Sequence, residues 1–185
     1  MTVDIDIAIK AKLDSAQNIL IVSHVRPDGD AIGSMLGLGL ALQAAGKTVQ
    51  MVLNDGLPAS FRHLPGSDQV KKEPQAGFNL FVTVDCADFR RVGKQFQTAP
   101  KPHINIDHHI TNEQFGDLNL IEPEAVATAA VLTDHLPRWG LEIRREVAAH
   151  LATGIVTEKT GREHAGTTVT ASYIGWHILL GKQQQ

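Results

Sequence analysis

The sequence predicts an α/β fold in which helices flank a parallel β-sheet. Three short apolar runs rich in Val, Ile and Phe, at 18–24, 78–85 and 103–109, each end in acidic or histidine residues. Runs of this kind are typical of buried parallel strands. Segments with helical composition lie between and after them, and this alternation indicates a parallel sheet with right-handed crossovers.

The N-terminal part predicts a helix followed by a βαβ unit. Apolar residues at every fourth position from Ile5 to Leu13 predict a short amphipathic helix that packs on the sheet. The first strand follows, and a dense run of small and apolar residues predicts a helix over 30–45, with Gly46 as its C-cap. A second strand is expected over 48–54.

Three glycines interrupt the helix expected over 30–45. Gly33, Gly37 and Gly39 each lower helix propensity by up to about 1 kcal/mol. A close approach to the sheet or to a ligand would be a sufficient reason for them. Their spacing lacks the G-x-G-x-x-G order, so a Rossmann-type cofactor binder is a weak alternative.

The rest of the chain predicts a loop and three helices around the remaining strands. The proline-rich stretch 55–77 predicts a loop with a short helical turn. Two helices are expected over 125–139 and 142–156, separated by a glycine. Thr168 is the expected cap of a final helix over 169–180.

Composition and charge indicate a soluble protein of one domain. The 185 residues are 43% hydrophobic and 20% charged, which is ordinary for a globular chain. The formal net charge of −3 gives no field that would hold a nucleic-acid duplex non-specifically.

The sequence also predicts a cytoplasmic location with no membrane partner. A single cysteine, Cys86, cannot form an intrachain disulfide, which suits a reducing compartment. Asp4 and Asp6 stand where a signal peptide would carry positive charge. The longest uncharged stretch, 31–46, has 16 residues, fewer than the roughly 20 that a membrane span needs.

The first chemical motif is the loop His24-Val-Arg-Pro-Asp28-Gly-Asp30, directly after the first strand. A stiff proline and a permissive glycine allow both carboxylates to turn inward beside the imidazole. This arrangement could hold a metal ion. The alternative is a simple strand-end turn in which Asp30 caps the following helix.

Two further strand ends carry the same types of residue. Asp85 ends an apolar strand, and Asp107-His108-His109 follows another. Asp85 alone could simply accept hydrogen bonds from loop amides. In open α/β sheets, however, ligands bind beyond the carboxyl ends of the strands, so these groups should converge at one edge. Several carboxylates in one crevice repel each other, and a pair of divalent cations is the simplest compensation.

Together these motifs resemble the DHH phosphoesterases. The resemblance rests on the loop 24–34, on Asp85 after its strand, on Asp107-His108-His109, and on Gly154-Ile-Val-Thr157 with the downstream His164-Ala-Gly-Thr-Thr168. It covers nearly the whole chain. The nearest branch contains the nanoRNases, the 3′-phosphoadenosine 5′-phosphate phosphatases and the cyclic-dinucleotide phosphodiesterases.

The resemblance implies a hydrolase of phosphate esters with two Mn²⁺ ions, for which Mg²⁺ or Co²⁺ could substitute. It assigns His24 and Asp28 to one metal, Asp30 and His108 to the other, and Asp85 to a bridge between them. It places His109 at the scissile phosphate or the leaving group, and Asp107 behind it as an orienting carboxylate. Arg26 and His164 are expected at the substrate, with Arg90 and Arg91 as weaker candidates for phosphate contacts.

The fourth motif departs from the family pattern. The family carries a metal-binding aspartate in Thr-Asp-Thr-Gly, whereas this chain has Thr157-Glu158-Lys159-Thr160-Gly161. Glu158 keeps the charge, but its side chain is longer by one C–C bond of about 1.5 Å. It is expected either as a metal ligand or as part of a solvated pair with Lys159.

A second departure concerns the domains. This branch has a smaller second domain with a Gly-Gly-Gly-His motif that grips the substrate. The expected arrangement here is a DHH-type catalytic domain over 1–181 and a polar tail over 182–185, with that second domain absent. A homodimer is a further expectation, because the family often pairs its subunits.

Two functions remain open on this basis. The first is metal-dependent hydrolysis of small nucleotides or short oligonucleotides by a phosphodiesterase, phosphatase or exonuclease. The second is a catalytically impaired metal- or nucleotide-binding domain. This alternative is favoured by Glu158 at the position of the family's aspartate and by the missing second domain.

Overall fold

The computed structural model describes residues 4–158, which form a six-stranded parallel sheet in the order β3-β2-β1-β4-β5-β6. The strands are β1 (Asn18–Val22), β2 (Thr48–Val52), β3 (Val70–Lys71), β4 (Leu80–Val84), β5 (Ile104–Asp107) and β6 (Leu118–Ile121). The helices are α1 (Ile5–Ser15), α2 (Gly29–Ala44), α3 (Thr128–His135) and α4 (Arg145–Glu158). The predicted fold class is confirmed.

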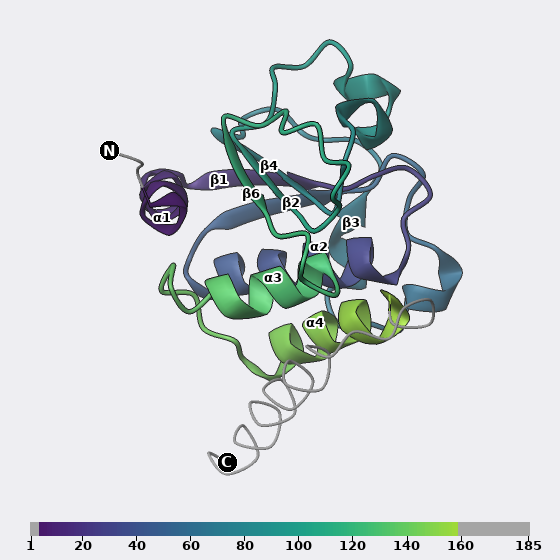
Figure 1. Ribbon diagram of the computed structural model, residues 1–185. Coiled ribbons are helices and arrows are strands. Elements are labelled where there is room, and N and C mark those ends of the chain that lie inside the picture. Colours follow the sequence, from purple (N-terminus) through teal and green to yellow (C-terminus); the bar gives the residue numbers. More distant parts are fainter. Residues whose placement is uncertain (1–3, 159–185) are drawn as a thin grey trace.

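The layers lie unequally on the two faces of the sheet. Helices α2 and α3 cover one face, α4 packs beyond them, and α1 lies at the end of the sheet near β6 (Figure 1). The main core fills the space between the sheet and these helices. The opposite face carries a smaller core, which the segment 86–99 covers with Val92 and Phe96.

The strand order creates a topological switch point at the edge where β1 and β4 end. The chain builds outward from β1 to β2 and β3, then returns to the other side of β1 with β4, β5 and β6. The connections after β1 and β4 therefore depart in opposite directions. In open α/β sheets such a switch point is where ligands bind.

Close packing between α2 and α4 explains the glycine-rich sequence of α2. A Cβ atom added at Gly33 would lie 2.5 Å from the His150 carbonyl oxygen and 2.7 Å from the Gly154 nitrogen. Backbone atoms cannot move aside at such distances. The expected close approach is thus real, but at Gly33 it is made to α4 instead of to the sheet.

The sequence missed two short edge strands. β3 has two residues and lies within the stretch predicted as a loop, and β6 has four. Both pair with only one neighbour in the described sheet and are too short to form the long apolar run that marks a central strand.

The C-terminal helices begin later than predicted. α3 starts at Thr128 because Ala127 is extended and the Asp30 side chain accepts from the first helical amides. α3 ends at His135, just before Pro137, which has no N–H to continue the helix. α4 covers Arg145–Glu158, and the helix predicted over 169–180 lies outside the described residues.

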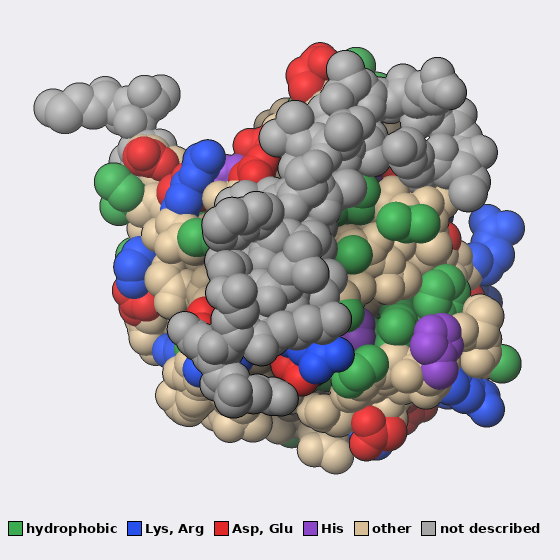
Figure 2. Space-filling view, turned by 90° about the horizontal axis from the view of Figure 1, so that it is seen from below, with side chains coloured by type: hydrophobic (Ala, Val, Ile, Leu, Met, Phe, Trp, Pro, Cys, Tyr) green, Lys and Arg blue, Asp and Glu red, His purple; other side chains and the backbone are tan. Residues whose placement is uncertain are grey.

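None of the helices in residues 4–158 has the length and apolar character needed to cross a bilayer. On the face seen in Figure 2, the described acidic and basic side chains are interspersed and form no single-sign patch.

Candidate metal centre

Three strand ends bring the predicted site residues to one edge of the sheet. The register pairs Val22 of β1 with Thr83 of β4, and Val84 of β4 with Ile106 of β5. The strands therefore end at nearly the same level. The loop after β1 supplies His24, Asp28 and Asp30, the end of β4 supplies Asp85, and the end of β5 supplies Asp107, His108 and His109.

Asp85 lies at the centre of this group. Its carboxylate oxygens are 3.5 Å from His24 Nε2, 3.7 Å from His109 Nδ1 and 3.9 Å from His108 Nε2. The side chain is buried, and the backbone has a φ of +52°, in the left-handed region. Asp is among the few non-glycine residues that adopt this region with little strain.

Two groups of ligand atoms share Asp85. Atoms of His24, Asp28 and Asp85 lie within 4.8 Å of one another, and so do atoms of Asp85, His108 and His109. The resemblance assigned Asp30 to the second group. An Asp30 carboxylate oxygen does lie 3.7 Å from His108 Nε2, but its shorter contacts are the hydrogen bonds it accepts from the backbone amides of Thr128 and Ala129.

Two of the histidines direct Nε2 toward the carboxylates. His108 Nδ1 lies 3.1 Å from the Ala125 carbonyl oxygen and donates to it. His108 Nε2 is buried and has no hydrogen-bond partner among residues 4–158. His24 is similar, since its Nδ1 lies 2.9 Å from the Val25 carbonyl oxygen while Nε2 faces two aspartates. Metal-ligating histidines typically show this pattern.

Asp28 and Asp30 have separate structural roles as well. Asp28 caps α2 by accepting from the amides of Asp30 and Ala31 at 3.1 Å each. Asp30 does not cap its own helix. It is buried and caps α3 instead, with its oxygens 2.7 Å from Thr128 N and 3.0 Å from Ala129 N.

The negative charges of the cluster are incompletely compensated, which favours a bound cation. Burial and repulsion from Asp85 hold the pKa of Asp30 well above its ordinary value. Burial also raises the pKa of Asp85. The surrounding histidines lower this pKa by more than burial raises it, so the pKa of Asp85 is below its ordinary value. Burial lowers the pKa of His24, and the attraction of Asp85 more than offsets this. Buried carboxylates that repel each other beside an unpartnered imidazole nitrogen fit divalent metal ions.

Asp107 orients His109. One Asp107 oxygen accepts from His109 Nδ1 at 2.7 Å and from the His108 amide at 2.8 Å. The other accepts from the Asn112 side-chain amide at 2.6 Å. The hydrogen bond to Asp107 raises the pKa of His109 to about 9, against the opposing effect of burial.

Thr128 is a site residue that the sequence did not reveal. Its buried hydroxyl donates to Asp85 at 2.9 Å and lies 3.5 Å from Asp107, while its amide donates to Asp30. One residue at the start of α3 thus contacts aspartates from three strand ends. A threonine in a stretch without other polar motifs gives no signal of this role.

The other predicted site residues that the structure describes, Glu158 and Arg26, lie outside the two groups of ligand atoms. Glu158 ends α4, is partly buried, and lies near enough to His108 and Asp28 for their charges to affect its pKa, which burial raises. It belongs to neither group of ligand atoms. Arg26 has an exposed side chain and a backbone amide that donates to Asp55. His164 lies outside the described residues.

Known proteins resemble the chain in both sequence and fold. It is 38% identical over 174 residues to the bifunctional oligoribonuclease and PAP phosphatase NrnA of Thermus thermophilus, covering 89% of this chain and 52% of that protein. The chain thus spans about half the length of this relative.

Solved structures give the same picture of the fold. An exopolyphosphatase-related protein from Bacteroides fragilis superposes with a TM-score of 0.86 at 26% identity, covering 96% of this chain and 56% of that one. The exonuclease RecJ bound to manganese shares the fold with a TM-score of 0.55 at 16% identity, covering 94% of this chain and 48% of that one.

The strand-end motifs fall within a match to a family model. The model described as the DHH family, N-terminal domain, matches residues 18–155, which include every strand of the sheet and the cluster around Asp85. The chain therefore belongs to the DHH family.

Proposed function

We propose that this chain hydrolyses phosphate esters of small nucleotides or short oligonucleotides with the help of two divalent metal ions. The observation that carries the proposal is the pair of ligand groups that share Asp85. His108 Nε2, which is buried without a hydrogen-bond partner in residues 4–158, adds to it. Two such ions activate water and neutralise phosphate oxygens during in-line displacement. His24, Asp28 and Asp85 would hold one ion, and Asp30, Asp85 and His108 the other.

His109 is suited to act on the substrate itself. Asp107 binds its Nδ1, so the ring is fixed while the side chain stays 38% exposed. The hydrogen bond to Asp107 raises the pKa of His109 and so favours the protonated ring, whose Nε2–H could donate to a phosphate oxygen or to the leaving oxygen. Nearby cations would lower this pKa, because they neutralise the carboxylates that raise it.

The relatives support the substrate class and the metal. NrnA of Thermus thermophilus is by its name an oligoribonuclease and a PAP phosphatase, and the solved RecJ structure contains manganese. We therefore extend to this chain small nucleotide substrates and Mn²⁺ as the metal, with Mg²⁺ or Co²⁺ as substitutes. The cytoplasmic location and the homodimer stay part of the proposal as expectations from the sequence alone.

Turnover of defined substrates tests the proposal. Purified protein with Mn²⁺ should hydrolyse bis-p-nitrophenyl phosphate, 3′-phosphoadenosine 5′-phosphate or a short oligoribonucleotide, and chelator should abolish this activity. Asp85→Asn is the decisive variant, because Asn also accepts the φ of +52° and the backbone is preserved. Full activity of this variant would contradict the assignment.

The position of Glu158 favours a second candidate function, a metal- or nucleotide-binding domain without turnover. Glu158 lies at the end of α4 outside both ligand groups, so the metal shell can lack one carboxylate. In that case the protein binds Mn²⁺ but does not hydrolyse any of these substrates. Glu158→Asp would then leave it inactive, whereas a gain in turnover would show that the glutamate only weakens an enzyme.

A further inference from the structure

Two adjacent arginines beside the cluster have different surroundings. Arg90 is 75% exposed on its side chain, and its guanidinium binds Asp88 at 2.7 Å and Glu113 at 3.4 Å. Arg91 is partly buried, and within residues 4–158 no carboxylate lies within ion-pair distance of it. Its guanidinium instead lies 3.2 Å from His24 Nδ1.

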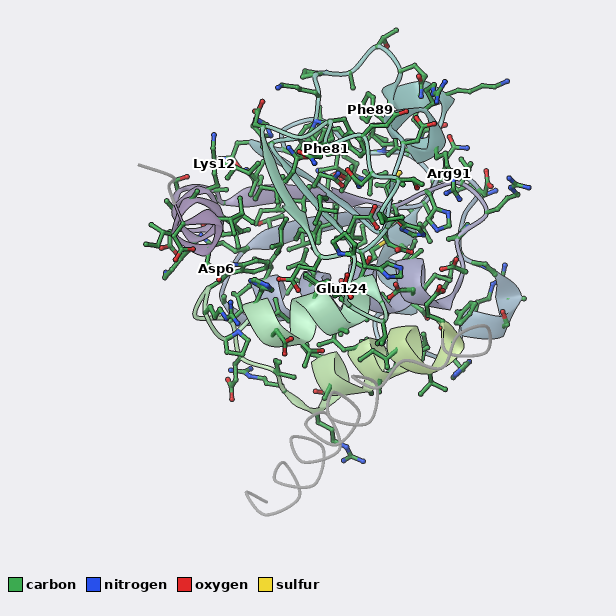
Figure 3. All side chains as sticks on the ribbon, viewed as in Figure 1. Asp6, Lys12, Phe81, Phe89, Arg91 and Glu124 are labelled. Carbon is green, nitrogen blue, oxygen red and sulfur yellow. The ribbon has the colours of Figure 1, made fainter. Side chains whose placement is uncertain are left out.

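The backbone holds Arg91 next to the candidate metal centre. The Val25 amide donates to the Arg91 carbonyl oxygen at 2.6 Å, and the Arg91 amide donates to the Asp88 carbonyl oxygen at 2.9 Å. These bonds tie the short helical turn Phe89–Val92 to the loop that carries His24. Figure 3 shows Arg91 beside this loop.

His24 cannot serve as the acceptor for Arg91. Its Nδ1 lies 2.9 Å from the Val25 carbonyl oxygen, which can only accept, so Nδ1 donates to that oxygen. The Arg91 guanidinium therefore faces another donor, and several of its N–H groups have no acceptor among residues 4–158. A partly buried guanidinium in this state favours an anion with several oxygens, and a phosphate group matches its planar donors.

We propose that Arg91 binds a phosphate group of the substrate. The inference rests on the proposed function and adds a specificity-determining residue to it. Arg90 does not share the role, because Asp88 and Glu113 already neutralise it. Arg91 also differs from Arg26, whose side chain is exposed.

Equilibrium binding separates the two arginines. Arg91→Met removes the charge and keeps an apolar stem for packing, and Arg90→Met is the matched control. The probe is adenosine 5′-monophosphate added to the Mn²⁺-loaded protein in a calorimeter. We expect Arg91→Met to weaken binding on the order of 10- to 100-fold, the value of a charge-assisted hydrogen bond. Arg90→Met should change it by less than about 2-fold.

A third variant and a metal titration complete the test. Arg91→Lys keeps a charge without the planar fork, so its affinity for the probe should lie between the other two. The affinity for Mn²⁺ should stay within about 3-fold in all variants, since Arg91 is expected to contact phosphate and not the metal.

Three results would overturn the inference. These are a lack of binding by the unsubstituted protein, equal losses for Arg90→Met and Arg91→Met, and a parallel loss of Mn²⁺ and nucleotide affinity in Arg91→Met. The last would show that Arg91 acts by positioning His24. Turnover is measured separately, so an inactive protein that still binds nucleotide through Arg91 would refute the proposed hydrolysis alone.

Discussion

The buried hydroxyl of Thr128 makes the metal-free protein more stable, and Thr128→Val should reveal by how much. Thr and Val have nearly the same shape, so the substitution removes a donor without opening a cavity. The hydroxyl donates at 2.9 Å to Asp85, a buried carboxylate. The second contact, 3.5 Å to Asp107, is too long to add much.

The expected cost follows from the charge of the acceptor. A hydrogen bond to a charged group contributes about 1.5–3 kcal/mol, against about 1 kcal/mol for a neutral pair. We therefore expect Thr128→Val to lower the free energy of unfolding by about 2 kcal/mol in the presence of chelator. For a chain of this size, that corresponds to a fall in the melting temperature of roughly 4–8 °C.

Thr133→Val is the matched control on the same helix. Thr133 is also buried, but its hydroxyl donates to the Ala129 carbonyl oxygen at 2.8 Å, a neutral acceptor within the helix. Its loss should cost less than about 1 kcal/mol. Urea unfolding followed by circular dichroism measures both variants. Equal costs for the two substitutions would refute the claim that the Asp85 charge makes the Thr128 bond strong.

Further predictions concern pH, packing and metal. His150 is buried, and burial lowers its pKa below the ordinary value of 6.5, against the opposing effect of the Pro65 backbone. The unfolded chain therefore binds the extra proton more readily, and the free energy of unfolding falls as pH drops below about 6.5. His150→Gln should flatten the urea-midpoint profile there, by at most about 1.4 kcal/mol per pH unit, and the exposed His63→Gln should not. Gly33→Ala should destabilise by about 1–3 kcal/mol, more than Gly39→Ala, whose added methyl meets only the flexible Met51 side chain; equal urea midpoints would argue against a backbone clash. Mn²⁺ at 100 times its Kd should raise the free energy of unfolding by about 2.7 kcal/mol, and a thermal shift that survives in Asp85→Asn would place the ion elsewhere.

The sequence allowed the central strands of the sheet to be predicted, but not the two edge strands or the start of α3. β1 and β4 are largely continuous apolar runs, because parallel strands in the middle of a sheet are buried on both faces. β5 has only two apolar residues, and the acidic and histidine residues at its end helped to mark it. β3 and β6 lie at the edges of the sheet and have only two and four residues, too few to stand out in the sequence. The start of α3 depends on the Asp30 carboxylate, which is 98 residues away in sequence from Thr128.

The sequence by itself determined which chemical groups stand at the strand ends, since His24, Asp85 and His108 each follow a short run whose apolar residues predict a buried strand. Parallel strands end at a common edge, so their convergence was predictable from topology. Only the tertiary structure decided which of these groups face each other, that Thr128 joins three aspartates, and that Arg91 and not Arg90 lies without a carboxylate partner in the described residues. Those relations arise from packing between distant segments, and no local pattern in the chain encodes them.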